Sequence, residues 1–160
     1  MTFTSLEKRM IAHGTAVTFI GMIAGLGLLM SLLGGIELIP GTITELAIPG
    51  PTDAWVRAHV GGILNGILTI VVAIVMSGIG VVDAAARRIY WMIVGAAWAF
   101  TVFYWAALFA PNRALSIGDN RWGESNLAGV IGFVPALAFT VFDLIGVYLL
   151  MRAAFRSARE

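Results

Sequence analysis

The sequence predicts an all-α integral membrane protein built as a bundle of four transmembrane helices. Of its 160 residues, 59% are hydrophobic and 12% are charged, and the mean hydropathy is +0.92. Soluble domains are less apolar, with about a quarter of their residues charged. Four apolar stretches are each long enough for the roughly 20 residues that one bilayer span needs. A chain of this length accommodates a single membrane domain over residues 1–160.

The helices are expected over residues of about 10–33, 54–82, 89–110 and 127–151. The first apolar stretch is too long for the core of a signal peptide, so we expect it to cross the membrane. Asp53 can cap the second helix, and Pro111 ends the third. Residues 34–53 alternate apolar and polar residues between prolines and glycines. This pattern predicts an extended outer loop, shaped like a hairpin.

The distribution of basic residues predicts the orientation of the chain in the membrane. Seven of the ten lie at the N-terminus, in the second connection and in the C-terminal tail, and three lie on the other side. The first group is Lys8, Arg9, Arg87, Arg88, Arg152, Arg156 and Arg159, and the second is Arg57, Arg113 and Arg121. Because cytoplasmic loops carry an excess of Lys and Arg, both termini are expected in the cytoplasm. The net charge of +1 gives no indication of nucleic-acid binding.

One segment carries most of the chemistry in this apolar sequence. It covers residues 57–66 and contains His59, one of only two histidines in a chain without cysteine. An imidazole near a helix end, with Gly62 and Gly66 at i+3 and i+7 on the same face, offers a nitrogen ligand beside bare backbone. This pattern favours a haem site. The alternative is an interfacial histidine hydrogen-bonded to a neighbouring loop, and the spacing alone leaves it open.

The second histidine is not expected to share an iron atom with the first. His13 should lie near the cytoplasmic end of the first helix and His59 near the outer end of the second. At 1.5 Å per residue, roughly 20 Å or more would separate them. A bis-histidine electron carrier within one subunit is therefore disfavoured, and five-coordinate iron with an open position is expected. We expect His13 to be structural.

Two further features have both a structural and a functional explanation. Gly21 and Gly25 form one pair of small residues four positions apart, and Gly62 and Gly66 form another. This spacing lets membrane helices approach closely, so packing is an alternative use of the second pair. Asp143 is an acid inside an apolar helix, where it is costly unless it is paired or faces a polar cavity. Both an interhelical hydrogen bond and a role in a site remain open for it.

Many of these residues resemble the styrene oxide isomerase family in order and spacing. The resemblance extends from residue 7 to about residue 126 and includes polar positions inside apolar stretches. The matching positions are Glu7-Lys8-Arg9-Met10, His13-Gly14, residues 35–41 with Glu45 and Pro49-Gly50, Arg57-Ala58-His59 with Asn65-Gly66, and Phe103-Tyr104 leading to Pro111-Asn112-Arg113. The last helix matches only in character.

The resemblance implies a homotrimer in the cell inner membrane that holds haem b between neighbouring subunits and isomerises aryl epoxides such as styrene oxide to aryl acetaldehydes. His59 would be the axial ligand of the iron, with Asn65 and Tyr104 as catalytic residues facing the substrate. Ferric haem would keep a Lewis-acidic sixth position for the epoxide oxygen. Ring opening and a 1,2-hydride shift, a Meinwald rearrangement, would then form the aldehyde, and a dry pocket would prevent hydration to a diol.

Ala96 departs from the family, whose members carry an aspartate at the matching position, eight residues before Tyr104. An acid there would orient its neighbours through hydrogen bonds. The departure therefore bears on substrate orientation and range rather than on the haem. Asp143 could compensate, although nothing in the sequence places it there. Two other classes of function remain: a non-catalytic haem protein such as an electron carrier or sensor, and a transporter or structural membrane protein without a cofactor.

Overall fold

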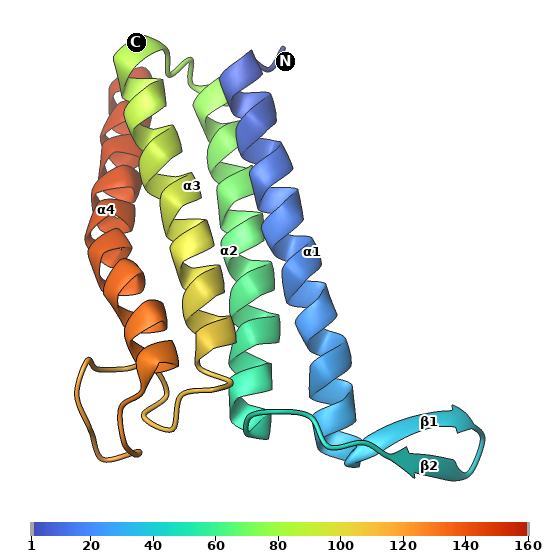
Figure 1. The fold of residues 1–160 in the computed structure, drawn as a ribbon. Coiled ribbons are helices and arrows are strands. Elements are labelled where there is room, and N and C mark those ends of the chain that lie inside the picture. The colour runs from blue at the N-terminus through green and yellow to red at the C-terminus, as the bar shows by residue number, and fades with distance from the viewer. Residues whose placement is uncertain (1, 160) are drawn as a thin grey trace.

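The computed structural model describes residues 2–159 and folds them into four long helices and one short β-hairpin (Figure 1). The helices are α1 (Ser5–Leu33), α2 (Thr52–Gly78), α3 (Asp83–Ala106) and α4 (Leu127–Ser157), and the strands are β1 (Gly35–Ile39) and β2 (Thr42–Glu45). Each helix is long and apolar enough to cross a membrane. The predicted fold class is confirmed: the protein is a multi-pass helical membrane protein.

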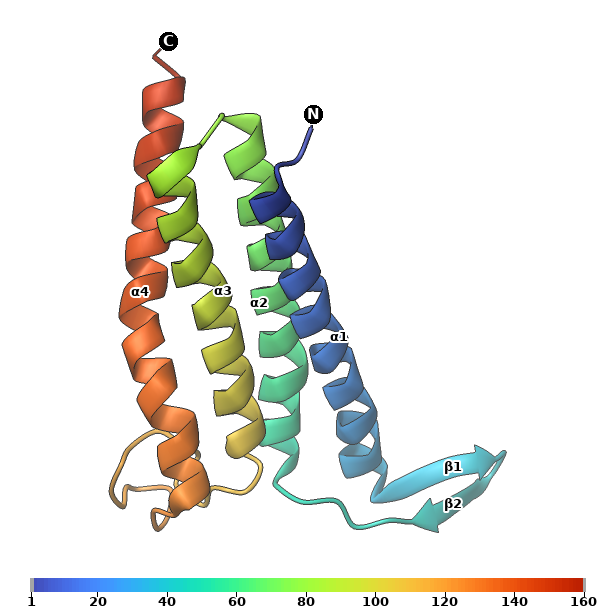
Figure 2. The same cartoon turned by 45° about the horizontal axis from the view of Figure 1, so that its top comes forward.

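The helices pack mainly on their sequence neighbours. α1 lies against α2, α2 against α3, and α3 against α4, with a smaller contact between α1 and α3. Both termini lie at one end of the bundle, and the hairpin and the loop before α4 lie at the other (Figures 1 and 2). Between 17% and 44% of the most apolar stretch of each helix is buried. Wide apolar faces are thus left for lipid or for other copies of the chain.

Helix ends depart from the predicted boundaries for local reasons. α1 begins at Ser5 because Thr4 and Glu7 form a capping box, in which the Thr4 amide donates to the Glu7 carboxylate at 2.7 Å and the Glu7 amide donates to the Thr4 hydroxyl at 3.3 Å. α4 continues six residues beyond the expected end, to Ser157. Hydropathy marks where a helix leaves the apolar layer, but charged residues can extend the same helix into water.

α3 is displaced towards the N-terminus relative to the prediction. It begins at Asp83, soon after the left-handed Gly80, whose φ is 69°. It ends at Ala106, four residues before the expected boundary, because tighter turns replace the helical hydrogen bonds. The Leu108 amide donates to the Trp105 carbonyl at 3.2 Å, three residues back. Such i to i+3 bonds commonly close the end of a helix.

The predicted extended loop after α1 is a two-stranded antiparallel hairpin. Gly34, in a left-handed conformation with φ 67°, ends α1, and Gly41, with φ 81°, turns the chain between the strands. Gly35 pairs with Glu45 at the base of the hairpin. In Figures 1 and 2 the hairpin extends sideways from the end of α1, away from the other helices. It does not cover the ends of α2, α3 and α4.

The loop between α3 and α4 is organised around Asn112, whose side chain is fully buried. Its amide nitrogen donates to the carbonyls of Ser116 and Gly118 at 3.0 and 3.2 Å, and its oxygen accepts from the Ala114 amide at 3.1 Å. These bonds satisfy backbone groups in a segment without regular structure. Asn126 then caps α4 by accepting from the Gly129 amide at 2.9 Å. The loop is therefore a folded unit.

Asn112→Ala should destabilise the protein, because three hydrogen bonds would be lost and buried backbone groups left unpaired. We expect a loss of about 2 kcal/mol, within the range for an unsatisfied buried polar group. The measurement is the midpoint of thermal unfolding in detergent. Glu124→Ala, in the same loop but at an exposed position, is the control and should leave the midpoint unchanged. Equal midpoints for the two variants would contradict this role for Asn112.

Candidate functional site

α1 and α2 approach each other closely through glycines. A Cβ atom at Gly62 would lie 2.8 Å from the Gly21 Cα atom, and one at Gly66 would lie 2.5 Å from the Gly14 carbonyl oxygen. Real Cβ atoms do not come so near, so neither position accepts a side chain without separating the helices. The close packing of α1 on α2 therefore explains why positions 62 and 66 are glycines. Packing was one of the two roles that the sequence left open for them. Their contact with haem remains a prediction.

His59 is held by this same contact. Its Nδ1 atom lies 2.9 Å from the Gly21 carbonyl oxygen on α1. Because a carbonyl only accepts, Nδ1 carries the proton in this bond, and the neutral ring keeps its free electron pair on Nε2. Gly25 makes room for the ring, since a Cβ atom there would lie 2.7 Å from Cε1. The packing thus orients a partly exposed imidazole and selects the tautomer suited to bind a metal through Nε2.

His13 has the structural contacts expected of it. Its Nδ1 accepts a hydrogen bond from the Trp98 indole of α3 at 3.2 Å, and its ring stands edge-on to those of Tyr90 and Trp98. On α1, Gly21 lies at the level of His59. It follows His13 by eight residues, which is about 12 Å along the axis of an α-helix. This is less than the separation estimated from the sequence. Because His13 Nδ1 accepts the bond from Trp98, the proton of the neutral ring is on Nε2, and neither ring nitrogen offers a free electron pair to a metal.

Asn65 lies on the side of α2 that faces α3, and Tyr104 of α3 packs against the same side. The Tyr104 ring packs directly over Gly61, where a Cβ atom would lie 2.5 Å from Cζ and 2.8 Å from the hydroxyl oxygen. Arg57, Gly61 and Asn65 follow each other at intervals of four residues and therefore share one face of the helix. The tyrosine hydroxyl thus lies over a glycine, with an arginine one turn away on one side and an asparagine one turn away on the other.

Two nitrogen atoms on this face are buried without a hydrogen-bond partner. They are Nη2 of Arg57 and Nδ2 of Asn65. The Arg57 atom lies 3.8 Å from the Asp53 carboxylate, which is close enough for an ion pair and too far for a hydrogen bond. Buried donors without a partner are costly, and most such groups in proteins are paired. Tyr104 lies between them, and Asn65 Nδ2 is therefore an unpaired donor one turn from the tyrosine hydroxyl.

Arg57 is a site residue that the sequence analysis did not single out. It is the one basic residue within α2, and this was the available signal. From the sequence, Arg57 was expected to influence membrane orientation and matched the family in the segment Arg57-Ala58-His59, but it had no assigned role in the site. Asp53, near the start of α2, forms an ion pair with Arg113 at 3.1 Å. The Arg113 guanidinium lies 3.6 Å from the centre of the Trp122 ring. The loop before α4 is thereby tied to the start of α2.

The structure does not bring His59 together with Tyr104 and Asn65 within one chain. His59 is turned towards Gly21 and Gly25 of α1, whereas Tyr104 covers Gly61 from α3. Two residues advance an α-helix by ~200°, so positions 59 and 61 point roughly 160° apart. The expected ligand and the expected catalytic residues therefore lie on different sides of α2.

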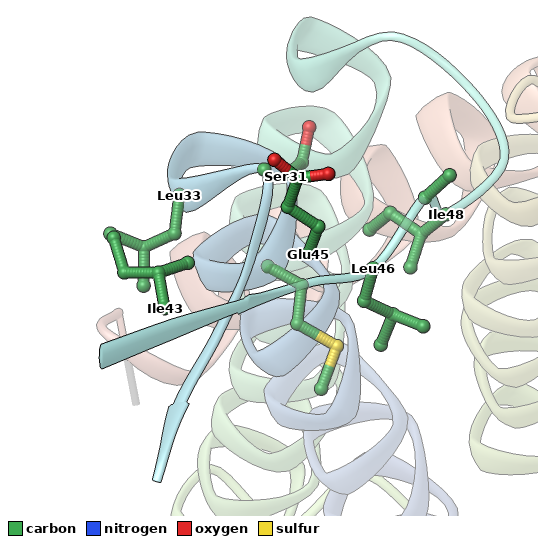
Figure 3. A pocket seen from close by; sticks show the side chains of 9 residues that line it. Ser31, Leu33, Ile43, Glu45, Leu46 and Ile48 are labelled. Carbon is green, nitrogen blue, oxygen red and sulfur yellow. The ribbon is translucent and has the colours of Figure 1, made fainter. Parts of the chain in front are cut away.

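A hollow of about 630 Å³ between the end of α1 and the hairpin contains none of these residues. In Figure 3, Leu33, Ile43, Leu46 and Ile48 surround it, with Ser31 and Glu45 as polar members. Its lining holds no histidine and none of the unpaired donors of α2. It belongs to the base of the hairpin and is not the candidate site.

The fold and these contacts define a multi-pass helical membrane protein with two polar regions on one apolar helix, and comparison with known proteins identifies it further. Residues 6–155 match the family model described as styrene oxide isomerase. The styrene-oxide isomerase of Pseudomonas fluorescens is 36% identical over 140 residues, which cover 88% of this chain and 83% of that protein. The chain belongs to the styrene oxide isomerase family and is an isomerase.

Gly61→Ala should impair the enzyme by displacing Tyr104. The new methyl group would overlap the tyrosine ring, so the ring or α3 must move, and misplaced catalytic groups lower rates steeply. We expect the isomerase rate to fall about ten-fold or more, measured with styrene oxide as the test compound. Gly118→Ala is the matched control, because its methyl group would enter open space. An unchanged rate in Gly61→Ala would contradict the placement of Tyr104 in the site.

Proposed function

We propose that this protein isomerises aryl epoxides such as styrene oxide to aryl acetaldehydes and uses ferric haem b as its cofactor. The benzylic C–O bond breaks, a hydride moves from the neighbouring carbon to the benzylic carbon, and the oxygen becomes the aldehyde carbonyl. No atom is gained or lost. The name of the Pseudomonas fluorescens relative supports this substrate class, and the match over most of both chains supports its transfer to this protein.

The orientation of His59 is the observation that supports the haem proposal. Its Nδ1–H is committed to the Gly21 carbonyl, which leaves Nε2 as the ligand atom and fixes the orientation of the ring. Residues 2–159 contain no group of three or more His, Cys, Asp or Glu residues able to hold a bare metal ion. A macrocycle supplies most of the ligands itself, so a single histidine suits haem. When bound, ferric haem would supply a Lewis acid that polarises the epoxide C–O bond.

Asn65 and Tyr104 would act on the epoxide oxygen, whereas Arg57 lies on the same face of α2 but about 12 Å from Asn65 along the helix axis, too far to share that oxygen. Asn65 presents a buried donor without a partner, and the Tyr104 hydroxyl lies one turn from it along α2. Donors already in place stabilise negative charge on oxygen as the ring opens. The surrounding helices are apolar, and water is thereby kept from the benzylic cation, which it would otherwise convert to a diol.

A second copy of the chain would complete this site. His59 and Tyr104 point to different sides of α2, so a group bound to His59 cannot meet Tyr104 of the same chain without passing around the helix. A neighbouring copy could present its own Tyr104 and Asn65 to it. The wide apolar faces left on each helix support such an assembly, and we propose the trimer that the family resemblance implies.

The charge distribution also supports an orientation in the cell inner membrane. The basic residues concentrate at the end of the bundle that holds both termini. This end would be cytoplasmic, and the hairpin and the loop before α4 would lie on the outer side. His59, seven residues after the start of α2, would then lie close to the outer surface of the membrane.

His59→Ala should remove most of the bound haem and the conversion of styrene oxide to phenylacetaldehyde. The reason is that His59 offers the free Nε2 electron pair, whereas His13 is held in the contact with Trp98. Haem is measured by the Soret absorbance of the purified protein, and the aldehyde by chromatography.

His13→Ala is the matched control and should keep both the haem and the activity. Full haem content in His59→Ala would exclude it as the ligand. A wild-type protein that formed no aldehyde from styrene oxide would overturn the proposed function itself.

Two inactive variants should restore activity when they are produced together, if the site is shared between subunits. His59→Ala and Asn65→Leu would each break every site alone, but a mixed trimer contains one interface with both residues intact. With random assembly, three quarters of trimers are mixed and one site in three is intact, so about a quarter of the wild-type rate is expected.

The control pairs Asn65→Leu with Tyr104→Phe, which alter the same side of the site and should not complement each other. Activity of the first mixture that is no greater than that of its separate components would place the whole site within one chain.

A further inference from the structure

We infer that Asp143 positions Asn65 by accepting a hydrogen bond from its side-chain amide, across the junction of α2, α3 and α4. The inference rests on the proposed function, because it concerns a residue assigned there to the epoxide oxygen. Asp143 is not itself placed against the substrate. It acts through its neighbour and is a positioning residue.

The two side chains line the same narrow gap inside the bundle. Asn65 and Thr69 enter it from α2, Ala96 and Phe100 from α3, and Asp143 from α4. The gap has no space for a water-sized sphere. A water molecule therefore cannot serve as the missing partner of the buried Asn65 Nδ2 atom.

Contacts on both sides of Asp143 show that it faces α3 rather than lipid. Phe139, four residues before it, fills the space beside Gly95 of α3, and Gly146, three residues after it, packs against Ile93 of α3. Positions i−4 and i+3 lie on the same face of a helix as position i. Asp143 is half-buried and thus lies against α3, and an acid in an apolar layer needs a partner.

Asp143 is the acceptor that the gap offers to Asn65. The Thr69 hydroxyl donates to the backbone carbonyl of Asn65 at 2.8 Å, its oxygen does not accept from Asn65 Nδ2 in this structure, and a carboxyl group is the stronger acceptor. Ala96 and Phe100 have no polar side-chain atoms, and no basic residue lines the gap. A carboxyl group keeps an acceptor oxygen whether or not it is protonated. The structure shows no hydrogen bond between the two side chains, so the bond that we infer requires one of them to reorient.

This bond would determine which atoms Asn65 presents to the substrate. An amide nitrogen has two hydrogens, so one can be committed to Asp143 while the other points to the epoxide oxygen. Without the anchor the amide can rotate by half a turn and present its oxygen, which repels a negatively charged oxygen. The expected loss therefore falls on the rate of the chemical step more than on substrate binding.

The first test compares three variants in the membrane-extracted protein with styrene oxide. Asp143→Leu should lower kcat about ten-fold with little change in KM, the effect of one lost hydrogen bond to an acid. Asp143→Asn keeps an acceptor oxygen and should retain most of the rate. Thr69→Val is the control, because it changes the same gap without removing the acceptor. A kcat in Asp143→Leu equal to that of the wild type would overturn the inference.

The second test asks whether the effect passes through Asn65. In an Asn65→Leu background, which has too little activity for a comparison of rates, Asp143→Leu should cause no further loss in the midpoint of thermal unfolding, because its partner is already gone. Ala96 lines the same gap, so Ala96→Asp should restore part of the rate to Asp143→Leu by supplying an acceptor from α3. Equal losses in the two backgrounds would show that Asp143 acts independently of Asn65, contrary to the inference.

A third test does not depend on turnover. The infrared carboxyl band assigned to Asp143, identified by its loss in Asp143→Asn, should shift in Asn65→Leu and stay in place in Thr69→Val. An unchanged band in Asn65→Leu would exclude the hydrogen bond even if Asp143→Leu cannot be purified. If the wild type lacks activity towards styrene oxide, the proposed function fails, while the infrared result still decides the Asp143 contact.

Discussion

The close contact between α1 and α2 is the constraint on which the candidate site depends. Membrane helices gain little from excluding lipid, so they associate through packing and interhelical hydrogen bonds. Here Gly14 and Gly21 of α1 let the backbones approach, Gly25 makes room for the His59 ring, and the Gly21 carbonyl becomes its acceptor. The same contact thus holds the helices together, orients the imidazole and selects its tautomer.

α2 separates two kinds of chemistry because its opposite sides meet different helices. The side towards α1 carries His59, while the side towards α3 carries Arg57 and Asn65, with Tyr104 packed over Gly61. Such a division suits an enzyme whose subunits complete one another's sites.

The helical architecture follows from composition, and the observed helices differ from the predicted ones mainly at their ends. Four apolar stretches with short connections leave few alternatives in a bilayer, where every backbone polar group must be paired internally. Hydropathy could not locate Ser5 or Ser157, because caps and charged turns beyond the membrane determine those ends. The sideways direction of the hairpin was equally out of reach, since alternation predicts strands but not where they lie.

The sequence by itself determined the class of protein, the family and the residues with chemical capacity, because these depend on composition and on rare polar positions. Only the tertiary structure decided which of them meet. It packed Gly62 and Gly66 against α1, put Arg57 on the face of α2 that Tyr104 covers, and brought Asp143 and Asn65 into the lining of one gap. The physical reason is that spacing fixes the face of a helix on which a side chain lies, whereas the neighbour on that face depends on how separate helices pack.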